Sequence, residues 1–481
     1  DAVRTADADA RGISASFAAA VGAMLPSATV GGKIGAGLGG DVFLSAGNVE
    51  ITAGGENLAD AKALVASISV GAGVAGARAT ALIEDTADVM AVVGSSAVIA
   101  ATGAVKVDAR HQGVNKNKAY AEAIGGAGGA FGGVSVMLAE AEVGGAVIAD
   151  FDGDVSTASQ VTVQANGANL ALAHTVAASL GGVLGGSLTG AAANVTDQAD
   201  VEATVGSTSS ITTGGAVLVK ATGENDAVTD SDAGSAGGIV GIAGSSLQAI
   251  VAGGVKAELD GDVQDASSVK VEAIGDNDAQ ATAFAIAIGG LGAGAGADAY
   301  AEVTSSADVE ALVGSSSQLT VPGAPVNVLA TGDNNATATA NGGAIGGLSI
   351  AAMLPTAKVG GGVKAEFDGQ MTGGSALLLN VKGLGENTAD ATVRVASIGM
   401  LGGGAGARST AQVTSAADVE ARVGVNADIS TSGAVLVDAR LQGLENKAFA
   451  QALGLAGGTF LGVSVMLAEA EVGGAVIADF D

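Results

Sequence analysis

The sequence predicts an all-β fold: an elongated tandem-repeat array of antiparallel strands, arranged either as a β-solenoid-like stack or as a bent meander. Three observations predict it. Long segments recur at fixed spacings, side chains alternate with a period of two, and glycine pairs punctuate the segments. Glycine occurs 79 times and proline only four times, which is typical of turns between strands that keep their backbone donors.

The longest repeat is a super-repeat of 329 residues. Residues 133–152 and 462–481 carry the same letters, and the Met-Leu-Pro at 24–26 recurs at 353–355. We therefore divide the chain at two points. Residues 1–152 are equivalent to residues 330–481, which start a second copy, and residues 153–329 complete the first.

Two shorter markers divide the super-repeat into units of about 110 residues, each made of two half-units. A Gly-x-Asn-like element recurs once in successive half-units, and its asparagines are Asn57, Asn117, Asn169, Asn225, Asn277, Asn334, Asn387 and Asn446. The pattern Ala-Asp-Val-(x)3-Val-Gly marks alternate half-units, and it begins at Ala87, Ala199, Ala307 and Ala417. Equivalent segments should share one structure, so we assign strands to all of them.

One half-unit gives the order of elements. Residues 268–274 predict a short strand, and a bend follows at Gly275-Asp276-Asn277. Residues 278–288 predict a strand with alanine at every odd position, followed by a glycine turn at 289–296 and a returning strand at 297–302. Alternation gives each sheet one face of methyl groups, so we expect close-packed Ala/Gly-rich sheets. The apolar side chains Phe284, Ile286 and Ile288 lie on the other face and need cover from another repeat, in this chain or a neighbour.

Composition excludes several classes of function. The formal net charge of −29, without a basic stripe, argues against nucleic-acid binding. Cysteine is absent, and no long apolar run predicts insertion into a membrane. The two histidines, His111 and His174, lack the neighbours that a general base or a zinc site needs. We expect a protein that is not an enzyme and requires no cofactor.

Acidic residues recur at the end of one strand type and are the candidate metal ligands. They are Asp150, Asp152, Asp154, Glu258, Asp260, Asp262, Glu366, Asp368, Asp479 and Asp481. Carboxylates at alternate positions, with one more after the turn, supply the oxygen ligands that Ca²⁺ prefers. The competing interpretation is that Asp-Gly simply forms a tight turn, and this interpretation is favoured because Gly37 and Gly39 replace Glu366 and Asp368 in the first copy.

The asparagine column also has two interpretations. Stacked asparagines form side-chain amide ladders in β arrays. Asparagine also tolerates the left-handed backbone of a bend, and we favour this second interpretation here.

The Gly/Ala/Val-rich, cysteine-free, acidic β-repeats resemble the giant repetitive surface proteins of bacteria, in particular the filamentous-haemagglutinin-like and leukotoxin-like repeat adhesins. The resemblance implies secretion, display at the cell surface and a rod that extends reach or forms fibres. We expect a structural segment of an extracellular filament or sheath whose partner is itself. The alternatives are the spacer shaft of a giant adhesin, stiffened by calcium if the acidic clusters bind it, and an S-layer or matrix protein.

Overall fold

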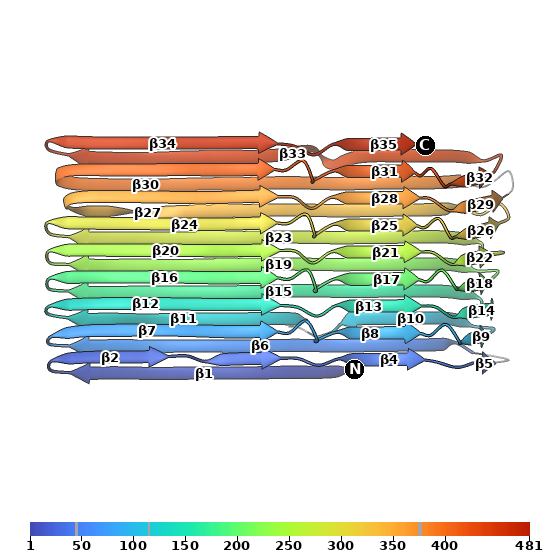
Figure 1. Cartoon of the computed structure of the whole chain (residues 1–481), viewed down its shortest axis with the longest axis horizontal. Coiled ribbons are helices and arrows are strands. Elements are labelled where there is room, and N and C mark those ends of the chain that lie inside the picture. Colours follow the sequence, from blue (N-terminus) through green and yellow to red (C-terminus); the bar gives the residue numbers. More distant parts are fainter. Residues whose placement is uncertain (44–46, 114–115, 374–377) are drawn as a thin grey trace.

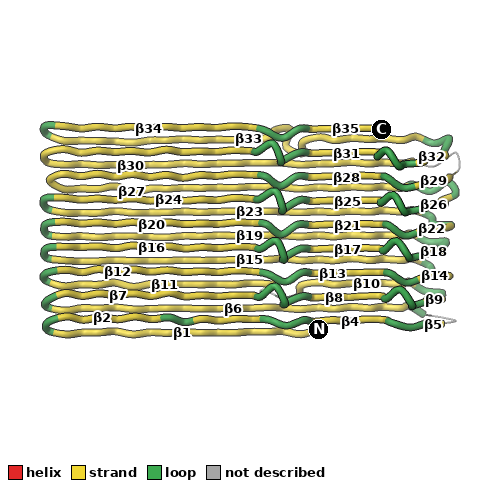
Figure 2. Tube along the Cα trace, viewed as in Figure 1, coloured by secondary structure: helices red, strands yellow, loops and turns green. Residues whose placement is uncertain are grey.

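The chain winds into a β-solenoid, and every regular element that it contains in the described residues is a strand (Figure 2). The computed structural model describes residues 1–43, 47–113, 116–373 and 378–481. In this part of the chain nine coils stack along one axis, and each predicted half-unit forms one coil (Figure 1). The coils, numbered 1 to 9, span residues 2–43, 49–100, 104–157, 160–212, 216–264, 268–321, 326–373, 378–430 and 434–480.

Coil 4 shows the path of the chain. The long strand β15 (Gln160–Gly181) ends at a glycine turn, and the return strand β16 (Leu184–Val195) runs back across the core. Two short strands, β17 (Val201–Val205) and β18 (Ser210–Thr212), then complete the circuit. Each coil thus has a thin half near the glycine turn, made of two opposed strands, and a wider half that the short strands close.

The other strands occupy equivalent places. The long strands are β1 (Ala2–Ser16), β6 (Val49–Ser69), β10 (Ala104–His111) with β11 (Asn117–Gly129), β19 (Ala216–Gly237), β23 (Ser268–Gly289) and β33 (Ala434–Gly458). The return strands are β2 (Ala19–Met24) with β3 (Ser27–Val30), β7 (Ala72–Ile83), β12 (Gly132–Val143), β20 (Val240–Val251), β24 (Gly292–Val303) and β34 (Leu461–Val472). In coils 7 and 8 one strand continues through the turn, as β27 (Val326–Val359) and β30 (Leu378–Val413).

The short strands form two further sheets. The first contains β4 (Ile34–Leu38), β8 (Val89–Val93), β13 (Val147–Phe151), β21 (Val255–Leu259), β25 (Val309–Val313), β28 (Val363–Phe367), β31 (Val419–Val423) and β35 (Val476–Phe480), together with β17. The second contains β5 (Val42–Phe43), β9 (Val98–Ala100), β14 (Asp154–Thr157), β22 (Asp262–Gln264), β26 (Gln318–Val321), β29 (Gln370–Gly373) and β32 (Asp428–Ser430), together with β18. The described residues include no long apolar helix of the kind that crosses a membrane.

The prediction of antiparallel strands is wrong, because the strands pair in parallel with their equivalents in neighbouring coils. β15 pairs with β19 from Val161–Val217 to Gly181–Gly237 without a shift of register. The returning strand does not pair with the strand before it. It lies on the opposite side of a thin core and pairs with the next return strand, as β16 does with β20. Of the two predicted arrangements, the structure is therefore the solenoid and not the meander.

Two apolar cores run along the axis inside the coils. The alanines at alternate positions of the long strands point inward against the return strands, and Ala279, Ala281 and Ala283 are fully buried. The wider half is filled by larger side chains, among them Val201, Phe151 and Phe367. Small side chains thus bring the two layers together in the thin half, and valine and phenylalanine fill the wider half.

The sequence boundaries at 152 and 329 fall within continuous structure. Residue 152 lies between β13 and β14, and residue 329 lies inside β27. Coil 7 takes the place of coil 1 one super-repeat later, so 329 residues correspond to six coils.

Candidate functional site: an amide ladder and carboxylate columns

The glycine of the Gly-x-Asn element lets two layers of the coil meet. A Cβ added to Gly167, Gly223 or Gly275 would overlap Cγ2 of the first valine of the neighbouring short strand, which is Val309 for Gly275. Glycine is needed there because the backbone lies against this valine and leaves no room for a side chain. The asparagine two residues later points inward on the same face, at the junction of the two cores.

The asparagines stack into a continuous hydrogen-bonded ladder. Asn277 Nδ2 donates to Asn334 Oδ1 over 2.8 Å, and the other steps between Asn57 and Asn446 measure 2.8–3.2 Å. Nδ2 also donates to a backbone carbonyl at the turn of its own coil, which for Asn277 is that of Ala307 at 3.1 Å. The seven asparagines from Asn57 to Asn387 are buried, so these bonds satisfy groups that water does not reach.

The preferred explanation of the asparagines as left-handed bend residues is wrong. Among the described residues other than glycine, only Lys116 and Asp265 have a positive φ. Each asparagine has extended backbone inside its long strand, and the ladder is the reason for its recurrence.

Arg4 occupies the ladder position in coil 1, where the register pairs it with Asn57. Its Nε donates to Asn57 Oδ1 over 2.8 Å. Its terminal nitrogens donate to the carbonyls of Gly31 at 3.1 Å, Ala87 at 3.2 Å and Gly32. The guanidinium has only donors. It therefore satisfies Asn57 Oδ1, which has no asparagine donor of its own, and it has no acceptor atom with which to continue the ladder.

The Ala-Asp-Val marker supplies a column of carboxylates that bind the turn of the following coil. Asp200 Oδ1 accepts the Gly254 N–H over 2.7 Å, and Asp308 Oδ1 accepts the Gly362 N–H over 2.6 Å. Asp88 and Asp418 do the same in their coils. Burial raises the pKa of Asp200 and of Asp308 to about 6. Sequence analysis missed this role, although the marker's recurrence in every second half-unit was its signal.

The predicted calcium ligands lie in register along the axis, two coils apart. Asp150, Glu258 and Glu366 alternate with Thr204 and Leu312 in the intervening coils. Asp150 accepts a hydrogen bond from Thr204 Oγ1 at 2.8 Å, while Glu258 and Glu366 form ion pairs of 2.7 Å with Lys256 and Lys364. The column therefore does not bring these three carboxylates together.

The acidic residues at the following turn also have partners in the protein. Asp154 and Asp262 each accept a backbone N–H of the next coil, from Ser210 at 2.9 Å and Gln318 at 3.1 Å. Asp368 accepts the Asn426 N–H at 3.0 Å. Asp152 lies against Gly206, and Asp260 lies against Gly314, each at a turn of the next coil. Asp479 and Asp481 lie in the last coil, where Asp481 forms an ion pair with Arg422. The described residues hold no cluster of three or more His, Cys, Asp or Glu side chains that could bind a metal. Calcium binding stays a prediction.

The two histidines have separate environments. His111 is half-buried, its Nδ1 accepts the Ala168 N–H over 3.1 Å, and the loss of contact with water lowers its pKa to about 3. His174 lies 3.5 Å from Glu122 and 3.9 Å from Asp230 on the outer face of the long strands. His111 is thus a neutral acceptor that holds two segments of backbone together.

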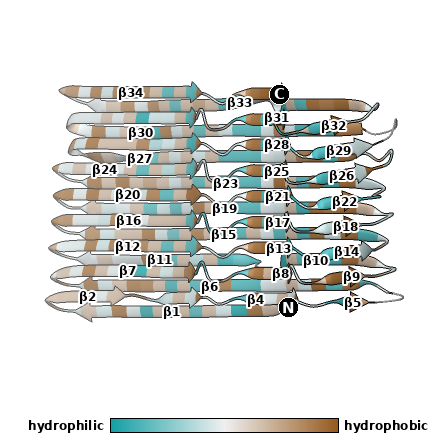
Figure 3. Ribbon diagram, turned by 45° about the vertical axis from the view of Figure 1, so that its right-hand side comes forward, coloured by the Kyte–Doolittle hydropathy of each residue, from teal (hydrophilic) through white to brown (hydrophobic). Residues whose placement is uncertain are grey.

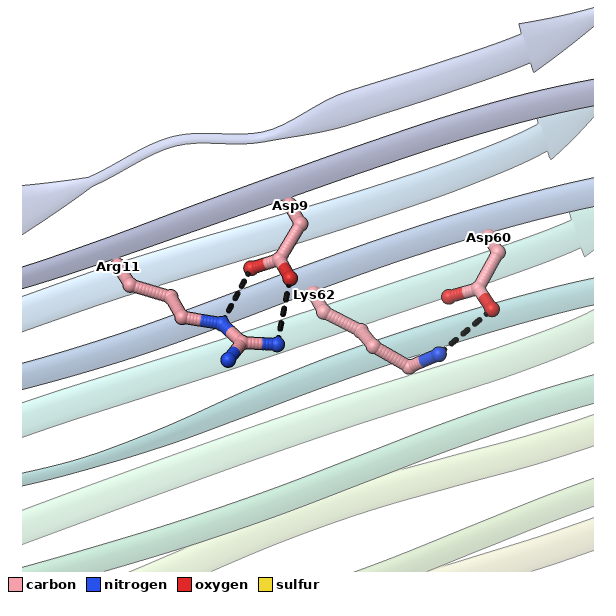
Figure 4. Close-up of polar contacts among 4 residues, drawn as sticks. All are labelled: Asp9, Arg11, Asp60 and Lys62. Carbon is pink, nitrogen blue, oxygen red and sulfur yellow. Dashed lines mark hydrogen bonds and ion pairs between the residues drawn. The ribbon is translucent and has the colours of Figure 1, made fainter.

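Polar and apolar residues alternate along the strands (Figure 3), and the exposed side chains differ between the two halves of each coil. On the outward face of the long strands, just after the ladder position in the sequence, residues two apart form ion pairs. Examples are Asp9 with Arg11 and Asp60 with Lys62, both at 2.6 Å (Figure 4). Toward the glycine turn the exposed side chains are apolar, and Phe131, Leu291 and Phe460 are 71%, 68% and 81% exposed. An open groove of about 770 Å³ on the long-strand face is lined by Phe284, Ile286, Ile345, Ile398 and Leu453, among others.

The amide ladder and the carboxylate columns form hydrogen bonds that join each coil to the next, and we therefore interpret them as a structural feature. Comparison with known proteins gives no match to a family model, to a curated protein or to a solved structure.

Proposed function

We propose that the chain is a structural segment of an extracellular filament or sheath built from tandem β-coils. The observation that carries the proposal is the unbroken ladder from Asn57 to Asn446, which joins coils 2 to 9 in one register. Because coils 8 and 9 repeat coils 2 and 3 and continue the same ladder, the same contacts can recur along an array of any length. A chain of this kind adds length without adding new kinds of contact.

The exposed apolar side chains near the glycine turns favour a filament or sheath over an isolated shaft. Large apolar surfaces on a protein in water mark places of association. An adhesin shaft remains the second candidate, since stacked coils suit a spacer equally well. An S-layer or matrix protein would associate into a lattice in two dimensions.

Cryo-electron microscopy of the assembled protein tests the proposal. Strands stack at about 4.8 Å, so a filament should show a layer line at that spacing and a repeat of about 29 Å for each six-coil super-repeat. Laterally joined arrays support the filament or sheath. Separate rods at every concentration support the adhesin shaft, and a planar lattice supports the S-layer.

A further inference from the structure

One outer surface of the solenoid is apolar in every described coil. It consists of the three outward positions of each return strand nearest the glycine turn, which in coil 3 are Gly132, Val134 and Val136. Parallel register carries these positions from coil 1 to coil 9, and they hold only Gly, Ala, Val, Leu or Ile. We call this surface the return face.

The return face has ridges and troughs. In coil 6 the three positions are Gly292, Gly294 and Gly296, and in coil 8 they are again three glycines. Between these troughs, coil 7 presents Leu348 and Ile350, which are 59% and 69% exposed. The relief is therefore as deep as a leucine side chain and follows the direction of the strands.

The glycines of the troughs have no explanation within the chain. A Cβ at Gly294 would meet nothing within 4 Å, and one at Gly296 or Gly404 would only approach a backbone oxygen at 3.8–3.9 Å. Their φ angles are negative or extended, so turn geometry does not require glycine either. Glycine weakens a strand, and on an open face it marks close approach by another surface.

The return face is large enough for a stable pairing. Nine coils at about 4.8 Å and six residues at about 3.3 Å give roughly 850 Å² per partner before relief is counted. This equals the share that each partner contributes to an interface of standard size, about 800 Å². The sheets are also close to flat across the stack (Figure 1), as sheets with side-chain ladders or stacked partners are, so a second flat face can lie against all nine coils.

From the extent and relief of this surface we propose that the return face binds the return face of a second copy of this chain. The inference rests on the structural role proposed above and names its lateral contact. A two-fold axis along the strands at coil 5 sets coil 6 of one copy opposite coil 4 of the other. Leu184 and Leu188 of coil 4 then enter the glycine trough of coil 6, and coil 2 likewise faces the trough of coil 8.

The test is sedimentation equilibrium of the purified chain and of two glycine variants. Gly296→Val fills the trough of coil 6 opposite Leu188 of the second copy without a clash inside the chain, so the monomer should fold as before. Gly234→Val is the matched control, because Gly234 also lies outward in a strand with only a backbone oxygen at 4.0 Å, but on the long-strand face. Leu188→Lys removes a ridge and adds a charge.

We expect the wild-type chain and Gly234→Val to dimerise alike, and Gly296→Val and Leu188→Lys to dimerise at least tenfold more weakly. Their urea unfolding midpoints, measured at concentrations where all proteins are monomeric, should stay within error of wild type. A wild-type chain that stays monomeric overturns the pairing but leaves the structural role intact. Equal dimerisation of all four proteins, or selective loss in Gly234→Val, also overturns it.

Discussion

Asn277 shows what one rung of the ladder does. Its Oδ1 accepts Asn225 Nδ2 at 2.9 Å, and its Nδ2 donates both to Asn334 and to the Ala307 carbonyl. The side chain is fully buried, so no water can replace it. Three bonds therefore depend on one residue.

We expect Asn277→Ala to lower the free energy of unfolding by about 2–4 kcal/mol, because each buried group that loses its partner costs about 1–3 kcal/mol. Urea unfolding measures the change. Asn335→Ala is the control, since Asn335 points outward from the strand β27 and donates to Asp278 Oδ1 over 3.1 Å on the outer face. A loss in Asn335→Ala as large as in Asn277→Ala would contradict the role of the ladder.

The carboxyls of Asp200 and Asp308 predict a pH dependence. Their pKa is raised by burial from about 4 in the unfolded chain to about 6 in the fold. Between these values the folded chain binds more protons, so the stability that these two carboxyls contribute is fully present below pH 4 and is lost as the pH rises through 6. Asparagine keeps an acceptor for the turn amide but does not titrate.

The double variant Asp200→Asn, Asp308→Asn should therefore lose less stability than wild type between pH 4 and pH 7. The measurement is the free energy of unfolding in urea at half-unit steps of pH. Parallel curves for the two proteins would mean that these carboxyls do not titrate differently in the folded chain.

Asp262 tests the calcium prediction. Its Oδ1 already accepts the Gln318 amide, and the register places Ser210 and Gln318, not carboxylates, beside it in adjacent coils. We expect calcium and a chelator to give the same unfolding midpoint for wild type and for Asp262→Asn. A calcium-dependent rise in wild type that Asp262→Asn lacks would establish a metal site there.

At the level of the element, the strands contain some glycines that packing requires and others that it does not. Gly275 faces Cγ2 of Val309 too closely for a Cβ, while Gly294 faces open space. Both are strand glycines of coil 6, so they differ in packing and not in secondary structure.

Gly275→Ala should destabilise the fold by about 1–3 kcal/mol through overpacking. Gly294→Ala should leave stability unchanged or raise it by up to about 1 kcal/mol, because alanine loses less backbone entropy than glycine. Thermal and urea unfolding of the two variants, compared under monomeric conditions, measure the difference. Similar effects at both positions would contradict the close approach at Gly275.

The sequence revealed the strands, the half-units and the inward alanines, because the period of two and the repeats are local signals. The pairing direction was not local. A glycine turn followed by a returning strand fits a hairpin, yet β23 and β24 pair only with neighbouring coils. The recurrence of one asparagine per coil, at Asn225, Asn277 and Asn334, was the evidence for parallel stacking, since residues one coil apart lie side by side in parallel register. The Asp200 contact needed that register before it could be recognised.

At the level of the whole molecule, the coils alternate in type. In coils with Ala-Asp-Val, an aspartate before the first short strand accepts a backbone N–H from the turn of the next coil, as Asp200 does from Gly254. In coils with Asp-Gly, an aspartate after that strand accepts a backbone N–H of the next coil, as Asp262 does from Gln318. The structural unit is therefore two coils.

Deletion of residues 201–308 removes one such unit and joins Asp200 to Val309, which occupies the place of Val201 two coils later. We expect this protein to fold, with a urea m-value lower by about a fifth, because m follows the surface exposed on unfolding. Deletion of residues 201–254 removes one coil and brings Asp200 and Asp308 into adjacent coils. That protein should be less stable than the two-coil deletion, although it is longer. The opposite order would contradict the two-coil unit.

The ladder also gives the solenoid a sense of direction. Every step from Asn57 to Asn446 donates toward the later coil, so the amide dipoles add and the oxygen end faces Arg4. Aligned dipoles in a dry core polarise one another and act as a partial charge at each end of the row. The guanidinium of Arg4 thus does for this column what a bound cation does at the C-terminus of a helix. The interior therefore carries a permanent dipole along the solenoid axis, and the positive charge of Arg4 in coil 1 compensates its negative end.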